Sequence, residues 1–249
     1  MALRDQLRDG MSDNPWRHLD VTQHGPYVLD VDRPFITAFN DALAARVTGS
    51  SVRSPLHIEE QLVPEPWLGR RDAPVCLLLL NPGVGDDDHQ LHADVAFRAR
   101  LAGTLATGDS SHFHLADSTL SAGRRWWSQA LASVRRDLKV PDASALSDAV
   151  SAIQLFPYHS REFAHLGVRI PSQAATIARV REQLERGTIL LVRSWLSWIG
   201  LVPELAQRAH EDHVFRLEGR RVHVSPSGLG TDAAYGLVLS ALSARLGSR

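Results

Sequence analysis

The stretch VCLLLLNPGVG, residues 75–85, decides the expected fold. Six consecutive apolar residues are typical of a strand buried on both faces, as in a parallel sheet. The sequence Asn81-Pro82-Gly83 that follows them favours a tight turn. These residues therefore predict a central strand whose carboxyl end leads straight into a loop that carries a side-chain amide.

Three further apolar segments predict strands, and helical patterns separate them. The strands are expected at residues 152–155, 188–192 and 221–224. A weaker pattern at 214–217 would form a hairpin with 222–224. The helices are expected at residues 35–47, 124–138, 172–185, 195–207 and 232–246, with an interruption at Pro203. Strands that alternate with helices indicate βαβ units. We therefore expect a three-layer α/β/α fold with a central, mostly parallel four-stranded sheet.

The chain of 249 residues, 44% of them hydrophobic, is expected to form a single domain with one large core. We expect residues 1–70 to be an N-terminal arm and helix, with little regular structure in residues 1–35, and residues 71–249 to be the catalytic α/β core. The longest apolar run, residues 75–80, is too short to cross a bilayer, and the N-terminus lacks the apolar region of a secretion signal. Neither feature points to a membrane partner.

Two compositional features bear on location and partners. Cys76 is the only cysteine, which excludes an internal disulfide or a four-cysteine zinc site and indicates a reducing cytoplasm. The net charge is −1, which argues against a nucleic-acid packaging protein. Lys139 is the only lysine among 27 basic residues, a bias that genomic base composition alone would explain. Adjacent arginines, such as Arg124-Arg125, could still bind phosphates locally.

Polar or aromatic turns follow each expected strand. In an open parallel sheet, ligands bind beyond the carboxyl ends of the strands, so these turns should share one edge. They are Asn81-Pro82-Gly83-Val84, Phe156-Pro157-Tyr158-His159, Arg193-Ser194-Trp195 and Ser225-Pro226-Ser227-Gly228-Leu229. Each is common turn chemistry by itself. Their joint position directly after buried strands predicts a binding site.

The order of these motifs resembles that of the uracil-DNA glycosylase superfamily, with the closest likeness to its mismatch-specific uracil/thymine branch. In that branch the first motif ends in Asn-Pro-Gly and the last reads Asn-Pro-Ser-Gly-Leu. The likeness spans roughly residues 75–245. It implies a small parallel sheet flanked by helices, and hydrolytic excision of a flipped-out base from DNA that carries a modified or mismatched base. It implies no metal and no organic cofactor, and we expect a monomer.

The resemblance assigns roles to residues of the first two motifs. Asn81 would hold the attacking water, and Gly83, between Pro82 and Val84, would let the flipped nucleotide come close. Gln154 stands about where the family places an amide that reads the base edge. Phe156 or Tyr158 would provide the face on which the extruded base stacks.

The last motif would contact the DNA backbone. Ser225, Ser227 and Gly228 would bind phosphates and cover the leaving base, and Leu229 would be the wedge that replaces the flipped base. Ser225 stands where relatives carry the His or Asn that stabilises the departing base. His223, on the same face by strand alternation, is the candidate substitute.

The first motif lacks the activating Asp of the most efficient uracil enzymes, although several acidic residues lie nearby. We take Asp87 as the candidate, with Asn81 and His223 as the other catalytic residues. Asp117 and Arg125, in the long connection of residues 86–149, would shape a pocket for a substrate larger than uracil. A bulky modified cytosine of phage DNA, which some relatives in the superfamily excise, would suit such a pocket, and both DNA repair and antiviral defence stay open as roles.

The chemistry of the residues favours a monofunctional enzyme. Lyase-type glycosylases need an amine nucleophile, and Lys139 lies between a helix and Pro141, away from the strand ends. Two alternatives remain open. A metal-dependent nucleotide or phosphoester hydrolase would use residues 86–92, with further histidines at His112 and His114, although a solvated loop is the simpler explanation of that stretch. A catalytically inactive DNA-binding module would retain the fold alone.

Overall fold

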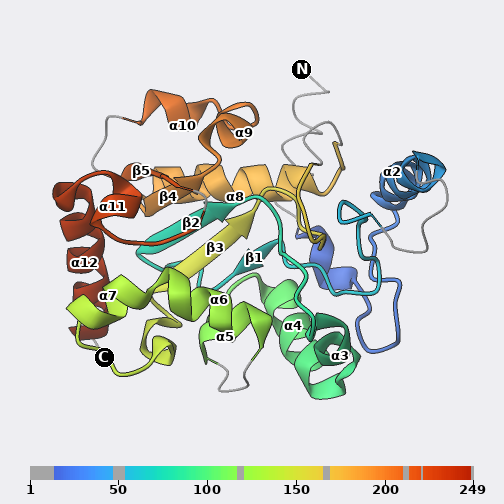
Figure 1. The fold of residues 1–249 in the computed structure, drawn as a ribbon, viewed down its shortest axis with the longest axis horizontal. Coiled ribbons are helices and arrows are strands. Elements are labelled where there is room, and N and C mark those ends of the chain that lie inside the picture. The colour runs from blue at the N-terminus through green and yellow to red at the C-terminus, as the bar shows by residue number, and fades with distance from the viewer. Residues whose placement is uncertain are drawn as a thin grey trace.

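A computed structural model of the protein describes residues 14–46, 54–116, 121–164, 169–209, 213–219 and 221–247. Its centre is a five-stranded sheet with the strand order β1-β3-β2-β4-β5 (Figure 1). The strands are β1 (Trp67–Leu68), β2 (Val75–Leu79), β3 (Val150–Gln154), β4 (Ile189–Arg193) and β5 (Val214–Leu217). β1 pairs antiparallel with β3, and the other pairs are parallel. The expected α/β class is confirmed, with one more strand than the four expected.

The central strands lie in register and are buried along their full length. Leu77 of β2 aligns with Ala152 of β3 on one side and with Leu191 of β4 on the other. Every residue of β2 and β3 is buried. A strand covered on both faces needs apolar side chains at successive positions, which is why an unbroken apolar run marks the middle of this sheet.

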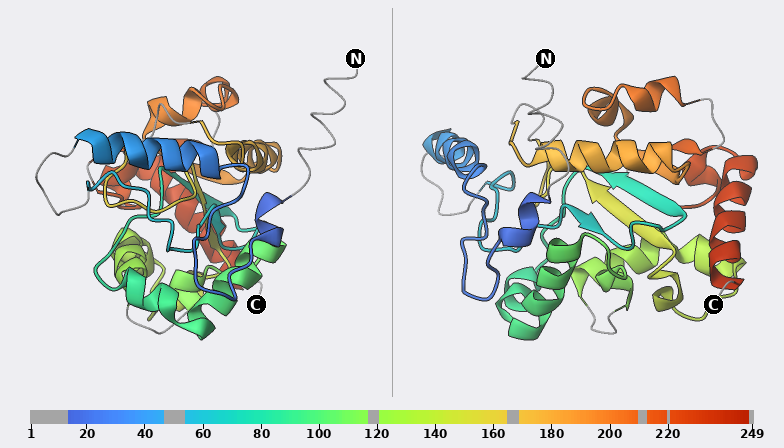
Figure 2. Two further views of the ribbon diagram at one scale, coloured as in Figure 1. Left: turned by 90° about the vertical axis from the view of Figure 1, so that its right-hand side faces the viewer. Right: turned by 180° about the vertical axis from the view of Figure 1, so that it is seen from behind.

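Helices cover both faces of the sheet and complete three layers (Figures 1 and 2). One layer holds α8 (Gln173–Glu185), which connects β3 to β4. The connection from β4 to β5 contains α9 (Trp195–Ile199) and α10 (Glu204–Gln207), which lie on the same side of the molecule. The opposite layer includes α6 (Ala122–Ala130) and α7 (Ala132–Asp137). The last helix, α12 (Asp232–Gly247), contacts β2 and the turn η2 (Ala143–Leu146).

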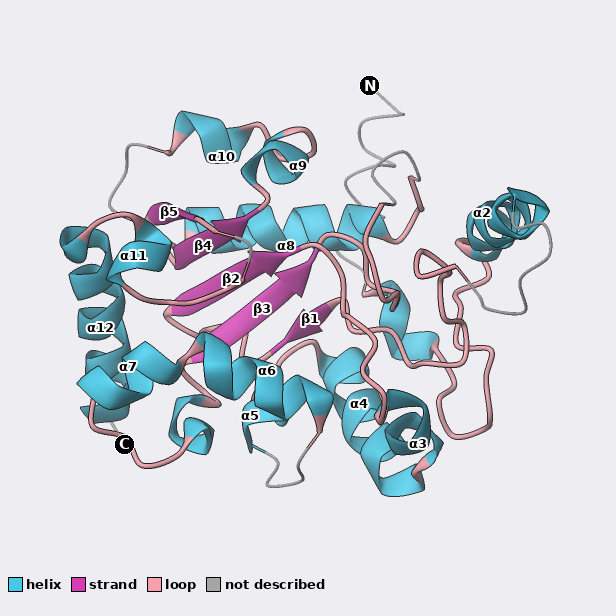
Figure 3. Ribbon diagram, viewed as in Figure 1, coloured by secondary structure: helices cyan, strands magenta, loops and turns pink. Residues whose placement is uncertain are grey.

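The long connection between β2 and β3 is largely helical rather than a solvated loop (Figure 3). It contains α3 (Asp88–Ala93), α4 (Val95–Thr107) and α5 (Phe113–Ala116) before α6 and α7. The single helix expected at residues 124–138 is divided at Leu131, which separates α6 from α7. The apolar spacing continues across this break, and therefore the sequence pattern does not reveal it.

The prediction of a strand at residues 221–224 is wrong. This segment has no strand structure, and the last strand is β5, formed by the weaker pattern at 214–217. Val222 and Val224 are buried while Arg221 and His223 are exposed, which produces the alternation of a strand. The backbone N–H of Val224 donates to the carbonyl oxygen of Ala130 at 2.9 Å. One-sided packing of a loop on α6 therefore imitates the pattern of a strand, and the expected hairpin does not form.

The N-terminal region is more closely packed than expected. The turn η1 (Pro15–His18) and α2 (Arg33–Arg46) frame a segment that buries Trp16 and Tyr27 in the core, so residues 14–35 are not a loose arm. β1 also comes from the region assigned to the arm. Within the described ranges, no helix has the length and apolar character needed to cross a bilayer.

Candidate active site

A cavity of about 720 Å³ opens at the carboxyl edge of the parallel strands. In the sheet, β2 lies between β3 and β4, and the chain passes from β2 to β3 on one side before it forms β4 on the other side. The cavity lies at this change of direction, which is where open α/β sheets bind ligands. The loop after β2 contributes Asn81, Pro82, Gly83 and Val84 to its wall, as the sequence predicts. A Cβ added at Gly83 would meet nothing within 4 Å, so the backbone there is open to close approach.

Asn81 is held in one orientation by the loop that follows β3. Its Nδ2 donates to the Oγ of Ser160 and to the carbonyl oxygen of Pro82, both at 2.9 Å. Its Oδ1 accepts no hydrogen bond within the described part of the chain. The amide therefore offers a fixed, unused acceptor at the wall of the cavity, which is what holding a water molecule requires.

Gln154, the last residue of β3, brings a second amide to the cavity. Its side chain is only 3% exposed. Its Oε1 is buried and has no hydrogen-bond partner among the residues that the structure describes. A buried unsatisfied acceptor costs on the order of 1–3 kcal/mol, so a ligand that donates to it would recover this energy. The structure thus places Gln154 in the wall of the same cavity as Asn81.

The aromatic wall is not the one expected. Phe156 and Tyr158 are both fully buried and do not line the cavity, so neither offers a stacking face. Tyr158 instead donates its hydroxyl to Asp32 at 2.8 Å. The wall includes Trp126, which is 40% exposed, and Trp127, with the two rings nearly perpendicular at a centroid distance of 4.9 Å. Both side chains come from α6.

The last motif shapes the cavity without lining it. Ser225 is the N-cap of α11 (Pro226–Leu229), and its Oγ accepts from the backbone N–H of Gly228 at 3.1 Å. A Cβ at Gly228 would lie 1.9 Å from the carbonyl oxygen of His223, so only glycine permits this close turn. The cavity wall is formed instead by Arg221, Val222 and His223. Ser227 is exposed and, like Ser225 and Gly228, lies outside the wall.

Leu229 is not available as a wedge, because it is only 7% exposed and belongs to the hydrophobic core. A residue that enters a DNA stack must project into solvent. The sequence pattern of the motif gives no sign of this burial.

Asp87 and Arg125 pair with each other and do not belong to the cavity wall. Their side chains approach to 3.3 Å, and the Oδ1 of Asp87 also accepts from the backbone N–H of Ala122 at 3.2 Å. These contacts join α3 to the start of α6. The structure therefore does not bring Asp87 to the proposed water, and neither residue lines the cavity. Asp117 lies outside the described residues.

Three arginines from three different segments line the cavity. Arg161 follows β3, Arg193 ends β4, and Arg221 belongs to the segment after β5. Arg161 also approaches Asp86 at 3.6 Å. Guanidinium groups placed in this way offer hydrogen bonds to an anionic ligand.

Glu65 and His114 also line the cavity, and sequence reasoning did not assign them to it. The Nε2 of His114 lies 3.3 Å from an Oε of Glu65. Burial alone would raise the pKa of Glu65, but His114, His159 and His92 outweigh it and lower this pKa to about 2. Glu65 is therefore ionised at neutral pH. It precedes β1 in an irregular segment with no periodic pattern, so only His114, within His112-Phe113-His114, carried a sequence signal.

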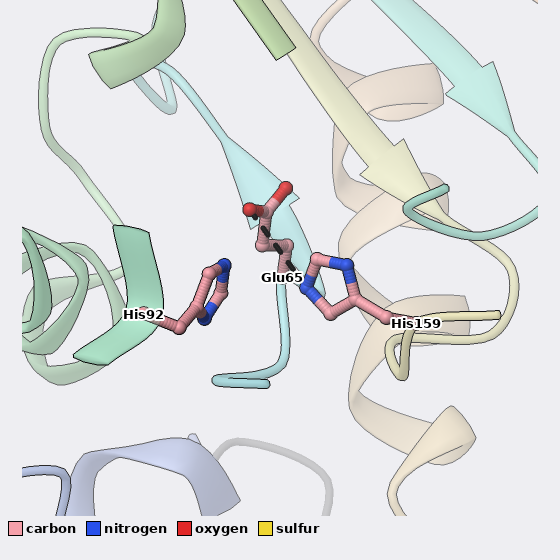
Figure 4. Close-up of side chains that lie close together, drawn as sticks. All are labelled: Glu65, His92 and His159. Carbon is pink, nitrogen blue, oxygen red and sulfur yellow. Dashed lines mark ion pairs between the residues drawn. The ribbon is translucent and has the colours of Figure 1, made fainter. Parts of the chain in front are cut away.

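A second group of titratable side chains shares Glu65 with the pair described above. Atoms of Glu65, His92 and His159 that could bind a metal lie within 4.8 Å of one another, and Figure 4 shows the three side chains converging. Both ring nitrogens of His159 face backbone carbonyl oxygens, of Gly83 at 2.8 Å and of Val63 at 3.0 Å. The ring of His159 therefore lies between the loop after β2 and the segment that contains Val63.

His92 is bound in the same way, because its Nδ1 accepts from the backbone N–H of Val63 at 2.8 Å. Burial, with a smaller contribution from His159, lowers the pKa of His92 to about 3. The carboxylates of residues 86–88 do not gather around it, because Asp87 pairs with Arg125 and Asp88 accepts from Gly85 N–H. Among the described residues, the stretch 86–92 therefore contributes only His92 to the group that could hold a metal.

Comparison with known proteins finds no family model, no curated protein and no solved structure that matches the chain. A function is therefore inferred from the residues that line the cavity.

Proposed function

We propose that the protein is a monofunctional DNA glycosylase that hydrolyses the N-glycosidic bond of a non-standard pyrimidine and leaves an abasic site. The supporting observation is the pair of amides, Asn81 and Gln154, that line one cavity with unused acceptor oxygens. Hydrolysis needs a positioned water, and excision of one base needs a group that reads its edge. Asn81 supplies the first function and Gln154 the second.

The substrate class follows from the size of the cavity. A volume of about 720 Å³ lies in the range that holds drug-sized ligands, and a bare pyrimidine would leave much of it empty. A pyrimidine with a bulky polar substituent, such as a modified cytosine, suits the remaining space. Trp126 offers an exposed ring at the wall, on which a base or a sugar substituent can stack. Which base is excised determines whether the role is repair or antiviral defence.

The proposal is tested with a panel of oligonucleotides, each single- and double-stranded. They carry uracil, a thymine mismatch, hydroxymethylcytosine, glucosylated hydroxymethylcytosine or unmodified cytosine. Abasic sites are detected by alkaline cleavage and released bases by mass spectrometry. We expect release of at least one modified pyrimidine in the presence of EDTA. Activity that requires a metal would favour the phosphoester hydrolase, and salt-dependent DNA binding without any product would favour the inactive module.

Replacement of Asn81 by Ala should reduce single-turnover excision by about 10²–10³-fold, because the water loses its fixed acceptor. DNA affinity, measured by fluorescence anisotropy, should change less than threefold. Asn81→Asp serves as a second variant, since it keeps an acceptor oxygen and should retain more activity than Ala. Equal activity of Asn81→Ala and the wild type would contradict the proposed role.

Gln154→Ala should weaken discrimination between bases more than it slows the preferred substrate. The expected loss of selectivity is about tenfold, the value of one hydrogen bond to a buried group. Gln207→Ala, a change of an exposed glutamine in α10, is the matched control and should behave as the wild type. An unchanged ratio of rates on the two best substrates of the panel would exclude Gln154 from base recognition.

A further inference from the structure

Glu65 and His114 form a buried acid–base pair inside the cavity, although they come from distant parts of the chain. Glu65 precedes β1 and His114 lies in α5. Their side chains are 4% and 11% exposed, and the contact between them is 3.3 Å. Both residues line the cavity together with Asn81. An ionised carboxylate beside an imidazole is the arrangement that orients a histidine for proton transfer.

The ring of His114 is held in place from its other side by α6. A Cβ added at Gly123 would lie 2.3 Å from the Cε1 of His114 and 2.4 Å from its Nδ1. No real Cβ approaches another atom so closely, so His114 can occupy this position only because residue 123 is glycine. The ring is therefore confined between the carboxylate of Glu65 and the backbone of α6.

This contact also selects the tautomer of the ring. The negative carboxylate of Glu65 favours the proton on Nε2, which lies toward it, and this leaves a lone pair on Nδ1. Nδ1 makes no hydrogen bond within the described part of the chain. The His114 side chain is 11% exposed and lines the cavity.

We propose that His114 is the general base of the reaction and that Glu65 is its positioning residue. This inference rests on the proposed glycosylase function. The Nδ1 of His114 takes one proton from the water held by Asn81. The water oxygen then bonds to C1′ of the sugar, and the N-glycosidic bond breaks with its electron pair passing to the base. The imidazolium returns the proton to the departing base, which balances the hydrolysis.

The test measures single-turnover excision and DNA affinity in four variants, with the substrate that the wild type processes best. His114→Ala should lose about 10²–10⁴-fold in rate, the usual contribution of a general base, with affinity unchanged. Glu65→Gln should lose less of the rate than His114→Ala does. The glutamine amide fills the same space and still contacts the ring, but it lacks the negative charge that orients the histidine. A merely structural role would change affinity and folding along with the rate.

Gly123→Ala provides a separate test, because it leaves both members of the pair intact and displaces the ring. We expect it to lose at least tenfold in rate. Gly103→Ala is the matched control, since Gly103 lies within α4 and its added Cβ meets nothing within 4 Å. This control should keep the wild-type rate. Equal rates of the two glycine variants would overturn the proposal.

Nitrogen-15 NMR of the histidine side chains in the free wild type is the second readout, and it needs no variant to fold. We expect the Nε2-protonated tautomer for His114, and an Nδ1-protonated ring would overturn the proposal. The excision assay distinguishes failure of the proposed glycosylase function from failure of the proposed role of His114. A wild type that excises no base ends both, whereas an active wild type with His114→Ala within threefold of it ends only the role of His114.

Discussion

At the scale of single residues, the orientation of Asn81 depends on Ser160. The hydroxyl of Ser160 accepts from the Asn81 amide at 2.9 Å and donates to the carbonyl oxygen of Glu162 at 2.8 Å. Ser160 thus links the loop after β3 to the loop after β2. Without this hydroxyl, the amide keeps its bond to the carbonyl oxygen of Pro82 but loses one of its restraints, so the acceptor oxygen is held less firmly. Positioning of this kind is a large part of what a hydrolytic site contributes.

Replacement of Ser160 by Ala should therefore slow single-turnover excision about five- to tenfold, which corresponds to one hydrogen bond of about 1 kcal/mol. DNA affinity should remain at the wild-type value, because Ser160 is 1% exposed and cannot contact DNA. Ser240→Ala, on the exposed face of α12, is the matched control. A rate equal to the wild type in both variants would show that Asn81 keeps its orientation without Ser160.

At the scale of elements, one buried carboxylate joins three segments. Asp32 stands directly before α2 and is fully buried. It accepts from the Tyr158 hydroxyl at 2.8 Å and from the backbone N–H of Ser172, the N-cap of α8, at 3.0 Å. Burial and the charge of Asp32 raise the pKa of Tyr158 well above its usual range, so its hydroxyl remains a donor. The N-terminal segment is attached to the core through this carboxylate.

Asp32→Ala should lower the free energy of unfolding by about 3 kcal/mol, because it leaves buried donors unsatisfied at two sites. Urea unfolding followed by circular dichroism measures this change. Asp41→Ala, on an exposed position of α2, is the matched control and should shift stability by less than about 0.5 kcal/mol. A similar loss in both variants would show that Asp32 contributes only through its local backbone.

At the scale of the whole molecule, stability should depend on pH because histidines are buried in neutral form. Burial, with smaller effects of neighbouring histidines, lowers the pKa of His92 and of His112 from 6.5 to about 3. Above pH 6.5 both are neutral in the folded and unfolded states, and their full contribution is present. As pH falls toward 3, the unfolded chain gains protons that the folded chain does not bind, so stability is lost.

Each of these histidines should therefore cost about 2 kcal/mol of stability on going from pH 7 to pH 5. Glu65 adds to the loss only below about pH 4.5, since its pKa is lowered to about 2. His112→Phe tests the claim, because both ring nitrogens of His112 are buried and have no partner in the described ranges, and an apolar ring replaces them well. This variant should lose about 2 kcal/mol less than the wild type between the two pH values, measured by urea unfolding. His18→Phe, at an exposed position, should leave the loss unchanged.

The sequence alone determined the class of the fold and the edge at which the site lies. An unbroken apolar run is recognisable because burial on both faces of a sheet demands it, and the turn after the run must reach the carboxyl edge. For this reason Asn81 and Gln154, which are tied to the ends of β2 and β3, stand where the sequence placed them.

Only the tertiary structure decided which other side chains reach the cavity. Phe156 and Leu229 follow a strand or a turn as expected, yet packing buries both. Glu65 and His114 lie 49 positions apart, and a contact over that separation leaves no trace in local periodicity. The periodicity of apolar residues shows which side of a helix or strand is buried. The distance between two loops depends instead on how the layers of the fold pack together. The acid–base pair could therefore be found only in the folded chain.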